Sequence, residues 1–271
     1  MLRDRLLTAA VGVPLLLYLI FWAPFGIFRA VVLGFTLLAL VEYFAMAFPG
    51  KRWLQLGGIG SGALLSLAMA NASAQSAYLF SGVVMGVVTV GLLSSLLTPD
   101  DPGKSLSRVG STLLGVLYAG AFLPHLIWLR VQPEDQGSAW VLYILAVAMG
   151  GDTAGYFAGR FWGRRLLMPS VSPKKTVEGA LGAVGGNLFA GTVVKAIFFP
   201  TIGWVEVLLL SLAAGALAQL GDLCESLLKR AFGAKDSGWL LPGHGGVLDR
   251  ADSLVFPTVL VYYYVNFLRV A

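Results

Sequence analysis

Apolar residues dominate this 271-residue chain in long runs rather than in short alternations. A transmembrane helix needs about 20 mostly apolar residues. The runs are bounded by glycine, proline or charge, and they predict an all-α, polytopic integral membrane protein with about nine transmembrane helices. The expected spans are residues 6–21, 25–48, 53–70, 77–97, 109–129, 139–161, 179–199, 204–228 and 252–268.

The first span follows a basic N-terminus, because Arg3 and Arg5 precede the apolar run. A secretory signal peptide has the same beginning but ends in a cleavage site of small residues. Residues 22–25 read Trp-Ala-Pro-Phe instead. We therefore expect a retained first helix.

The distribution of lysine and arginine predicts an orientation, since cytosolic loops carry an excess of these residues. With the N-terminus inside, 15 of the 19 lysines and arginines fall in inner segments. Nine spans then place the C-terminus outside. An error of one span in the middle of the chain would destroy this alternation. The four outer residues are Arg29, Arg130, Lys195 and Arg269.

Composition excludes an ordinary soluble domain. The chain is 57% hydrophobic and 12% charged, whereas soluble proteins carry about 25% charged residues. The single cysteine, Cys224, excludes an intrachain disulfide. We expect residues 1–138 to form an N-terminal unit of about five spans with unremarkable loops. Residues 139–271 are expected to form a second unit of about four spans, whose inner side is rich in charge and glycine and holds the candidate catalytic residues discussed below.

The sixth span carries Asp152 in its inner part. An ionisable residue at membrane depth is costly and marks a functional site by default; a structural pair with a basic neighbour is the alternative. Gly151, Gly155 and Gly159 are spaced four residues apart. This spacing is typical of close helix packing through small residues.

A second cluster precedes the seventh span. Lys174 and Lys175 lie between Ser172 and Thr176. Either hydroxyl is suited to cap a helix whose free N–H groups face an anion, and the lysines add positive charge. Anchoring to anionic lipid headgroups is the alternative reading.

The third cluster lies at the inner end of the eighth span. Asp222, Ser226 and Lys229 are spaced i, i+4 and i+7, so they share one helical face. Residues 204–230 would form about 40 Å of helix, which exceeds a hydrocarbon core of roughly 30 Å. We expect the charged end of this helix, with Arg230, to enter the inner interface or line a wet cavity.

A long loop, residues 231–248, follows and contains five glycines together with Lys235, Asp236 and His244. Glycine lets the backbone approach a ligand closely and present N–H groups to phosphate. Disorder is the alternative, which the tryptophan, leucine and proline content disfavours. For His244 the roles of general base, phosphate contact and loop staple all stay open.

Asp249 and Asp252 open the ninth span at positions i and i+3. Helix capping explains such acids in part, but Asp222 and Asp236 are also near in sequence. Mg²⁺ is typically bound through one or two carboxylates plus substrate phosphates. We therefore predict a Mg²⁺ site with Asp222 and Asp249 as leading ligands, then Asp252 and Asp236. Acids, lysines and glycine-rich backbone together are typical of phosphoryl or nucleotidyl transfer.

The stretch from Ser226 to Asp252 reads Ser-x₂-Lys-Arg-x₄-Lys-Asp-x-Gly-x₃-Pro-x-His-Gly-Gly-x₂-Asp-Arg-x-Asp. It resembles the signature of the phosphatidate cytidylyltransferases, or CDP-diacylglycerol synthases. The segments around Asp152 and 172–179 are similar to that family too, so the resemblance covers about residues 150–252. Ala251 stands where the family usually has a bulkier apolar residue.

The resemblance implies transfer of CMP from CTP to phosphatidic acid, with Mg²⁺, at the cytosolic face of a membrane such as the bacterial inner membrane. CTP, phosphatidic acid and membrane lipids are the expected partners. Nucleic acid is not expected, and a homo-oligomer stays open. Expected catalytic residues are Asp222, Asp249, Lys229 and His244; expected substrate-binding residues are Ser172, Lys174, Lys175, Arg230, Lys235 and Asp152.

Three other classes compete with this reading. A transporter or channel would use Asp152 and Asp222 as relays, but charge clustered on one side does not suit a path open to both. A CTP-dependent lipid kinase would share the general design and act on a polyprenol-type alcohol. A scaffold has no use for so many membrane-level acids.

Overall fold

The computed structural model describes residues 2–71, 75–97, 101–132, 136–238 and 245–268. Within them the chain is almost entirely helical, and the order of elements follows the predicted spans. The elements are α1 (Leu2–Phe21), α2 (Phe25–Ala47), α3 (Arg52–Ala70), α4 (Gln75–Leu97), α5 (Pro102–Gly120), α6 (His125–Arg130), α7 (Gln136–Trp162), β1 (Leu166–Met168), β2 (Ser172–Thr176), α8 (Val177–Phe198), α9 (Trp204–Ala231), α10 (Leu248–Tyr263) and the π-helix η1 (Tyr264–Leu268).

Eight helical segments in the described part of the chain are long and apolar enough to cross a membrane. The predicted all-α, polytopic membrane fold is therefore confirmed. α1 contributes only a shorter apolar stretch, Val11–Phe21. The count of nine spans, the orientation of the termini and the division at residue 138 stay predictions.

The structure differs from the sequence-based expectation in two places. The expected fifth span is divided, because α5 ends at Gly120 and α6 begins at His125. Pro124 lies between them, and proline disfavours helical backbone in the residue before it. The second difference is a small antiparallel hairpin in which Leu166 pairs with Thr176. Alternation patterns do not reveal strands of three and five residues.

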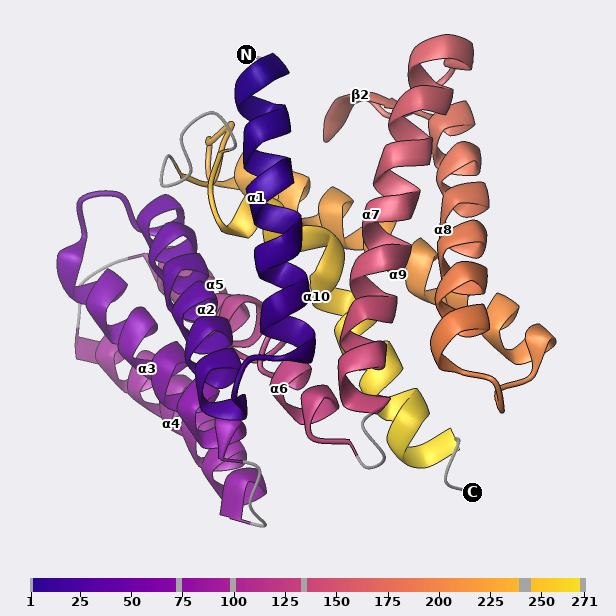
Figure 1. Cartoon of the computed structure of the whole chain (residues 1–271). Coiled ribbons are helices and arrows are strands. Elements are labelled where there is room, and N and C mark those ends of the chain that lie inside the picture. Colours follow the sequence, from indigo (N-terminus) through magenta and orange to yellow (C-terminus); the bar gives the residue numbers. More distant parts are fainter. Residues whose placement is uncertain (1, 72–74, 98–100, 133–135, 239–244, 269–271) are drawn as a thin grey trace.

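Figure 1 shows α2 to α5 grouped on one side of the molecule and α7 and α8 side by side on the other, with α9 and α10 joining them. The start of α1, the β hairpin and the segment after α9 lie toward one end, and the end of α10 lies toward the opposite end (Figure 1). The charged clusters of the second half are thus gathered at one end of the helical bundle.

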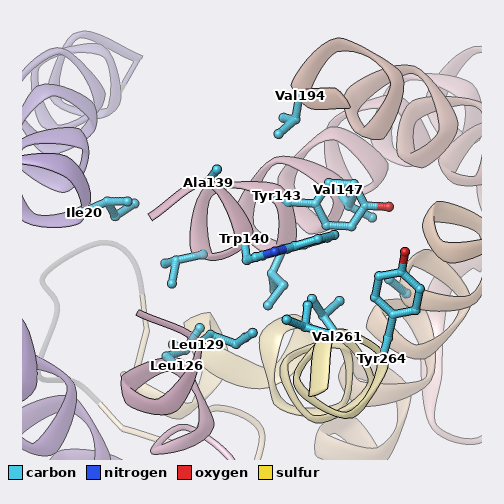
Figure 2. Close-up of a cluster of buried hydrophobic side chains, with 14 of the residues drawn as sticks. Ile20, Leu126, Leu129, Ala139, Trp140, Tyr143, Val147, Val194, Val261 and Tyr264 are labelled. Carbon is cyan, nitrogen blue, oxygen red and sulfur yellow. The ribbon is translucent and has the colours of Figure 1, made fainter. Parts of the chain in front are cut away.

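A buried aromatic cluster fastens the other end. Trp140 stacks on Phe199 with ring centroids 4.1 Å apart, and the Tyr143 hydroxyl lies 2.7 Å from Ser211 Oγ. Figure 2 shows Trp140 and Tyr143 of α7 among side chains that include Val261 of α10. Aromatic groups bury large areas and prefer tilted or offset contacts. This cluster fixes α7 against α8, α9 and α10 and so sets the frame for the charged end.

Small residues bring α7 and α8 into close contact at the charged end. A Cβ added at Gly155 would lie 3.1 Å from Gly179 O. A Cβ at Gly151 or at Gly215 would collide with the buried side chain of Asn187. The prediction that the glycines of α7 serve helix packing is confirmed, and Asn187 links α7, α8 and α9.

The predicted orientation gives opposite labelling at the two ends of α8. Ser170, between β1 and β2, and Thr201, between α8 and α9, are both exposed. In a Cys224→Ser background, Ser170→Cys should react with a membrane-impermeant thiol reagent only from the cytosolic side, and Thr201→Cys only from the outside. Each variant serves as the control for the other. Reversed labelling would invert the topology and place the charged end outside.

Candidate active site

A cavity of about 490 Å³ lies at the charged end, between α7, α8, α9 and β2. Its walls are the closely packed glycines of α7 and α8 together with a few polar side chains. The mixture of carboxylates and cations suits an anionic ligand that is accompanied by a metal ion. The polar side chains lining it are Asp152, Tyr156, Arg160, Lys174, Lys175, Thr176, Gln219 and Asp222.

Local structure at the start of α8 places the two lysines. The Thr176 hydroxyl accepts a hydrogen bond from the Gly179 amide at 3.1 Å, which is the side-chain cap expected at a helix N-terminus. Glu178 accepts from the backbone amides of Arg164 at 3.0 Å and Arg165 at 3.2 Å. These contacts hold the hairpin against α7 and α8, so that β2 carries Lys174 and Lys175 along the edge of the cavity.

Lys175 and Asp222 form an ion pair of 2.5 Å across the cavity. Each of the two side chains is 29% exposed, so both remain accessible to a ligand. The pairing joins the second and third clusters of the sequence, which are separated by all of α8.

Two further carboxylates, Asp152 and Asp252, lie near this pair. Asp152 interacts electrostatically with Asp222 and with Lys175. Asp252 of α10 interacts with both Asp152 and Asp222. Gly221 makes this possible, because a Cβ there would collide with the backbone oxygen of Asp252.

A separate charged cluster, made of Glu225, Lys229 and Asp249, lies between α9 and α10. Lys229 Nζ lies 2.5 Å from Asp249 Oδ1 and also forms an ion pair with Glu225. The Glu225 side chain is fully buried, and those of Lys229 and Asp249 are 13% and 12% exposed. One lysine therefore compensates two carboxylates in a nearly closed environment.

The remaining oxygen of Asp249 is held by the loop between α9 and α10. Asp249 Oδ2 accepts from the amides of Gly246 at 2.9 Å and Ser237 at 3.2 Å. Gly245 has φ of +80°, a conformation that favours glycine. Both oxygens of Asp249 are thus engaged, so its predicted role as a metal ligand would require these contacts to be exchanged.

Glu42 of α2 reaches the same loop from the first half of the chain. It is 3% exposed. Its carboxylate accepts from the amides of Val247 at 2.9 Å and Leu248 at 2.8 Å, and from Ser237 Oγ at 3.2 Å. The loop is therefore bound to α2 as well as to α10.

Several other predicted site residues lie away from the cavity. Ser172 is half-buried in β2 and does not line the cavity. Arg230, Lys235 and Asp236 are exposed beyond it, and Arg230 donates to the Ala234 carbonyl at 3.3 Å. His244 lies outside the described residues, so its role stays a prediction.

Sequence reasoning missed Glu42 and gave Glu225 no role. Both are acids within apolar helices, which is the signal that singles out Asp152. Glu225 also lies four residues before Lys229, the spacing of a helical ion pair. Glu42 is isolated in α2, far along the chain from the dense charges of the second half, so no clustering in the sequence indicates its partners.

The carboxylates of Asp152, Asp222 and Asp252 have the donor chemistry that fits a Mg²⁺ ion. Carboxylate oxygens are suitable ligands, and Mg²⁺ usually completes its coordination with water and substrate phosphates. Among the described residues, no three of the types His, Cys, Asp and Glu are grouped closely enough to hold a metal ion by themselves. Asp222, with Asp152 and Asp252 nearby, is therefore suited to an ion that arrives with a phosphate ligand.

Comparison with known proteins assigns the family. Residues 3–268 match the model of the "Cytidylyltransferase family". The chain belongs to this family. The match covers nearly the whole chain, so it includes the first half, for which the sequence motifs alone gave no assignment.

Curated relatives agree with this assignment. A "Phosphatidate cytidylyltransferase" of Synechocystis is 33% identical over 97% of this chain and 96% of its own length. The protein of that name from Bacillus subtilis is 37% identical over 59% of each chain, and the one from Brucella suis is 39% identical over 67% of this chain and 65% of its own. The latter two alignments thus span about three fifths of the relatives' lengths.

Proposed function

We propose that this protein transfers CMP from CTP to phosphatidic acid, which forms CDP-diacylglycerol and releases pyrophosphate. The observation that carries the proposal is the cavity at the end of the helical bundle, where Lys174 and Lys175 stand beside Asp152 and Asp222. Cations, carboxylates and a membrane-level position suit a reaction between a nucleotide and a lipid phosphate. The names of the curated relatives support the same substrates.

The proposed chemistry is one in-line displacement. An oxygen of the phosphatidate phosphate attacks the α-phosphorus of CTP, and a new P–O bond forms while the bond to the bridging oxygen of pyrophosphate breaks. The electron pair leaves with pyrophosphate. Because the attacking oxygen is already anionic, no side chain is needed to remove a proton from it.

The main obstacle to this step is repulsion between two anions. Lys174 and Lys175 are placed to hold phosphate oxygens and reduce that repulsion. A bound Mg²⁺ would add charge neutralisation at the phosphates, and Asp222, Asp152 and Asp252 are the carboxylates that would hold it. Asp249 would join this set only after releasing Lys229 or the loop amides.

A covalent nucleotidyl-enzyme, formed through a lysine or His244, is the competing mechanism. The other histidine, His125, is not placed to serve as such a nucleophile. His125 Nδ1 lies 3.0 Å from the Ala121 carbonyl oxygen, and its ring packs against Trp128 and Tyr262. It is absent from the cavity lining. One displacement inverts the configuration at the α-phosphorus and two retain it, so CTP made chiral there distinguishes the two mechanisms.

The purified protein in detergent micelles should convert labelled CTP and phosphatidic acid into CDP-diacylglycerol, with loss of activity when Mg²⁺ is removed. ATP, GTP and UTP serve as comparison nucleotides, and a polyprenol serves as a comparison acceptor. Product masses decide the outcome. A phosphorylated alcohol together with CDP would identify a lipid kinase instead, and absence of turnover with every pair would contradict the proposal.

A further inference from the structure

We propose that Glu42 is a positioning residue, which fixes the start of α10, where Asp249 lies, together with Ser237 of the preceding loop, and thereby makes the first half of the chain part of the site. Its role in turnover rests on the reaction proposed above, whereas the anchoring of the loop does not. Glu42 belongs to none of the charged clusters of the second half, and its loop partner Val247 lies 205 residues away along the chain.

The contact saturates a buried carboxylate. Oε1 accepts from the Val247 amide, and Oε2 accepts from the Leu248 amide and from Ser237 Oγ. A buried carboxylate is costly unless its oxygens are hydrogen-bonded. Val247 and Leu248 begin α10, and the N–H groups at a helix N-terminus favour a negative charge. Glu42 therefore supplies from α2 the cap that α10 does not obtain from its own N-cap side chain.

The loop is shaped around this carboxylate at two glycines. A Cβ at Gly238 would lie 2.5 Å from Glu42 Oε1, and a Cβ at Gly246 would lie 2.5 Å from Glu42 Oε2. Real Cβ atoms do not approach other atoms so closely. These two glycines thus make room for a side chain of the protein itself, in addition to any role in approaching a substrate.

Ser237 carries the effect from Glu42 to Asp249. Its hydroxyl donates to Glu42 and accepts from the Asp249 amide at 3.3 Å, and its own amide donates to Asp249 Oδ2 at 3.2 Å. Asp249 in turn pairs with Lys229. Loss of the Glu42 anchor should therefore displace Asp249 and Lys229 while leaving the Lys175–Asp222 pair in its place.

The test is the substitution Glu42→Gln, which keeps the size of the side chain and removes one acceptor. Hydrogen exchange followed by mass spectrometry should show amides 245–250 exchanging at least about tenfold faster, the effect of one lost hydrogen bond. Exchange in α7 and α8 should be unchanged. The turnover number should fall at least about tenfold, with the KM for CTP changed less than about twofold, because the lysines of β2 are not displaced.

Thr36→Val is the matched control. Thr36 is buried in the same helix, and its hydroxyl donates to the Val32 carbonyl of α2 at 2.8 Å. This variant should leave both exchange and turnover unchanged. If Glu42→Gln fails to fold, Ser237→Ala serves in its place, since it removes one hydrogen-bond donor to Glu42. It should also speed amide exchange in residues 245–250 and lower the turnover number, with smaller effects than Glu42→Gln.

The outcomes separate this inference from the proposed reaction. Faster local exchange in Glu42→Gln, in a protein that makes no CDP-diacylglycerol even as the wild type, would retain the anchor and refute the reaction. An active wild type with a Glu42→Gln variant unchanged in exchange and turnover would refute the positioning role. A uniform rise of exchange through all helices would also refute it, because it would show a general stabilising role.

Discussion

Replacing Asp222 with asparagine should lower the turnover number on the order of a thousandfold, the effect of removing one group that stabilises charge at the reacting centre. Asp222 lies on the cavity wall, is paired with Lys175 and interacts with the other two acids of the cluster. Asparagine keeps the volume but removes the negative charge that would hold a cation and that neutralises Lys175. The measurement is CDP-diacylglycerol formation by the purified variant over a range of Mg²⁺ concentrations.

The fold should survive this change, because the ion pair of Asp222 is partly exposed and such pairs contribute little to stability. Glu206→Gln is the matched control. Glu206 lies on the same helix at its opposite end, where it accepts from the Gly203 amide at 3.3 Å and from the Tyr264 hydroxyl. Its substitution should leave turnover nearly unchanged. Near-normal activity of Asp222→Asn with unaltered Mg²⁺ dependence would remove Asp222 from the site.

The sequence predicts both acids of the cavity wall, but each through a different pattern. An ionisable side chain within an apolar helix is costly, so its presence indicates a site or a partner. This rule identifies Asp152, whereas Asp222 is identified by its place in the charged cluster at the end of α9, and both line the same cavity. The rule says that a partner exists but does not identify it. Lys175 could be recognised as the partner of Asp222 only when the hairpin and α8 had been placed in space.

The cluster of Glu225, Lys229 and Asp249 shows a different limit of prediction from sequence. The helical spacing of Asp222 and Lys229 suggested that they act together, yet Lys229 pairs with Glu225 and Asp249. Residues that share one face of a helix can still contact different neighbours. The choice depends on where α10 crosses α9, which is set by the close approach at Gly221 and not by periodicity.

The local signals near α8 were predicted in part. Ser172 and Thr176 were equally good candidates for a helix cap, and the structure selects Thr176. Ser172 instead begins β2, where it pairs with Met168. A hairpin this short is not indicated by an alternation of apolar and polar residues. Its position depends on the contacts of Glu178 with the backbone amides of Arg164 and Arg165.

Substitution of Lys229 by methionine should destabilise the protein by about 3 kcal/mol, the cost of leaving buried charge without a partner. Glu225 is fully buried, and Asp249 is nearly so. Without the lysine, two carboxylates face each other across the α9–α10 contact. The midpoint of thermal unfolding in micelles should fall clearly, and turnover should be lost because the position of Asp249 depends on the same pair.

Two further variants distinguish this explanation from a simple loss of packing. Arg230→Met changes the neighbouring cation, whose side chain is exposed, and should alter stability by no more than about 0.5 kcal/mol. Adding Glu225→Gln to Lys229→Met removes one of the two uncompensated charges and should recover a large part of the lost stability without restoring turnover. If the double variant is no more stable than Lys229→Met, the buried charges do not determine the stability of this end of the bundle. The cluster would then owe its stability to the packing of the lysine side chain between α9 and α10.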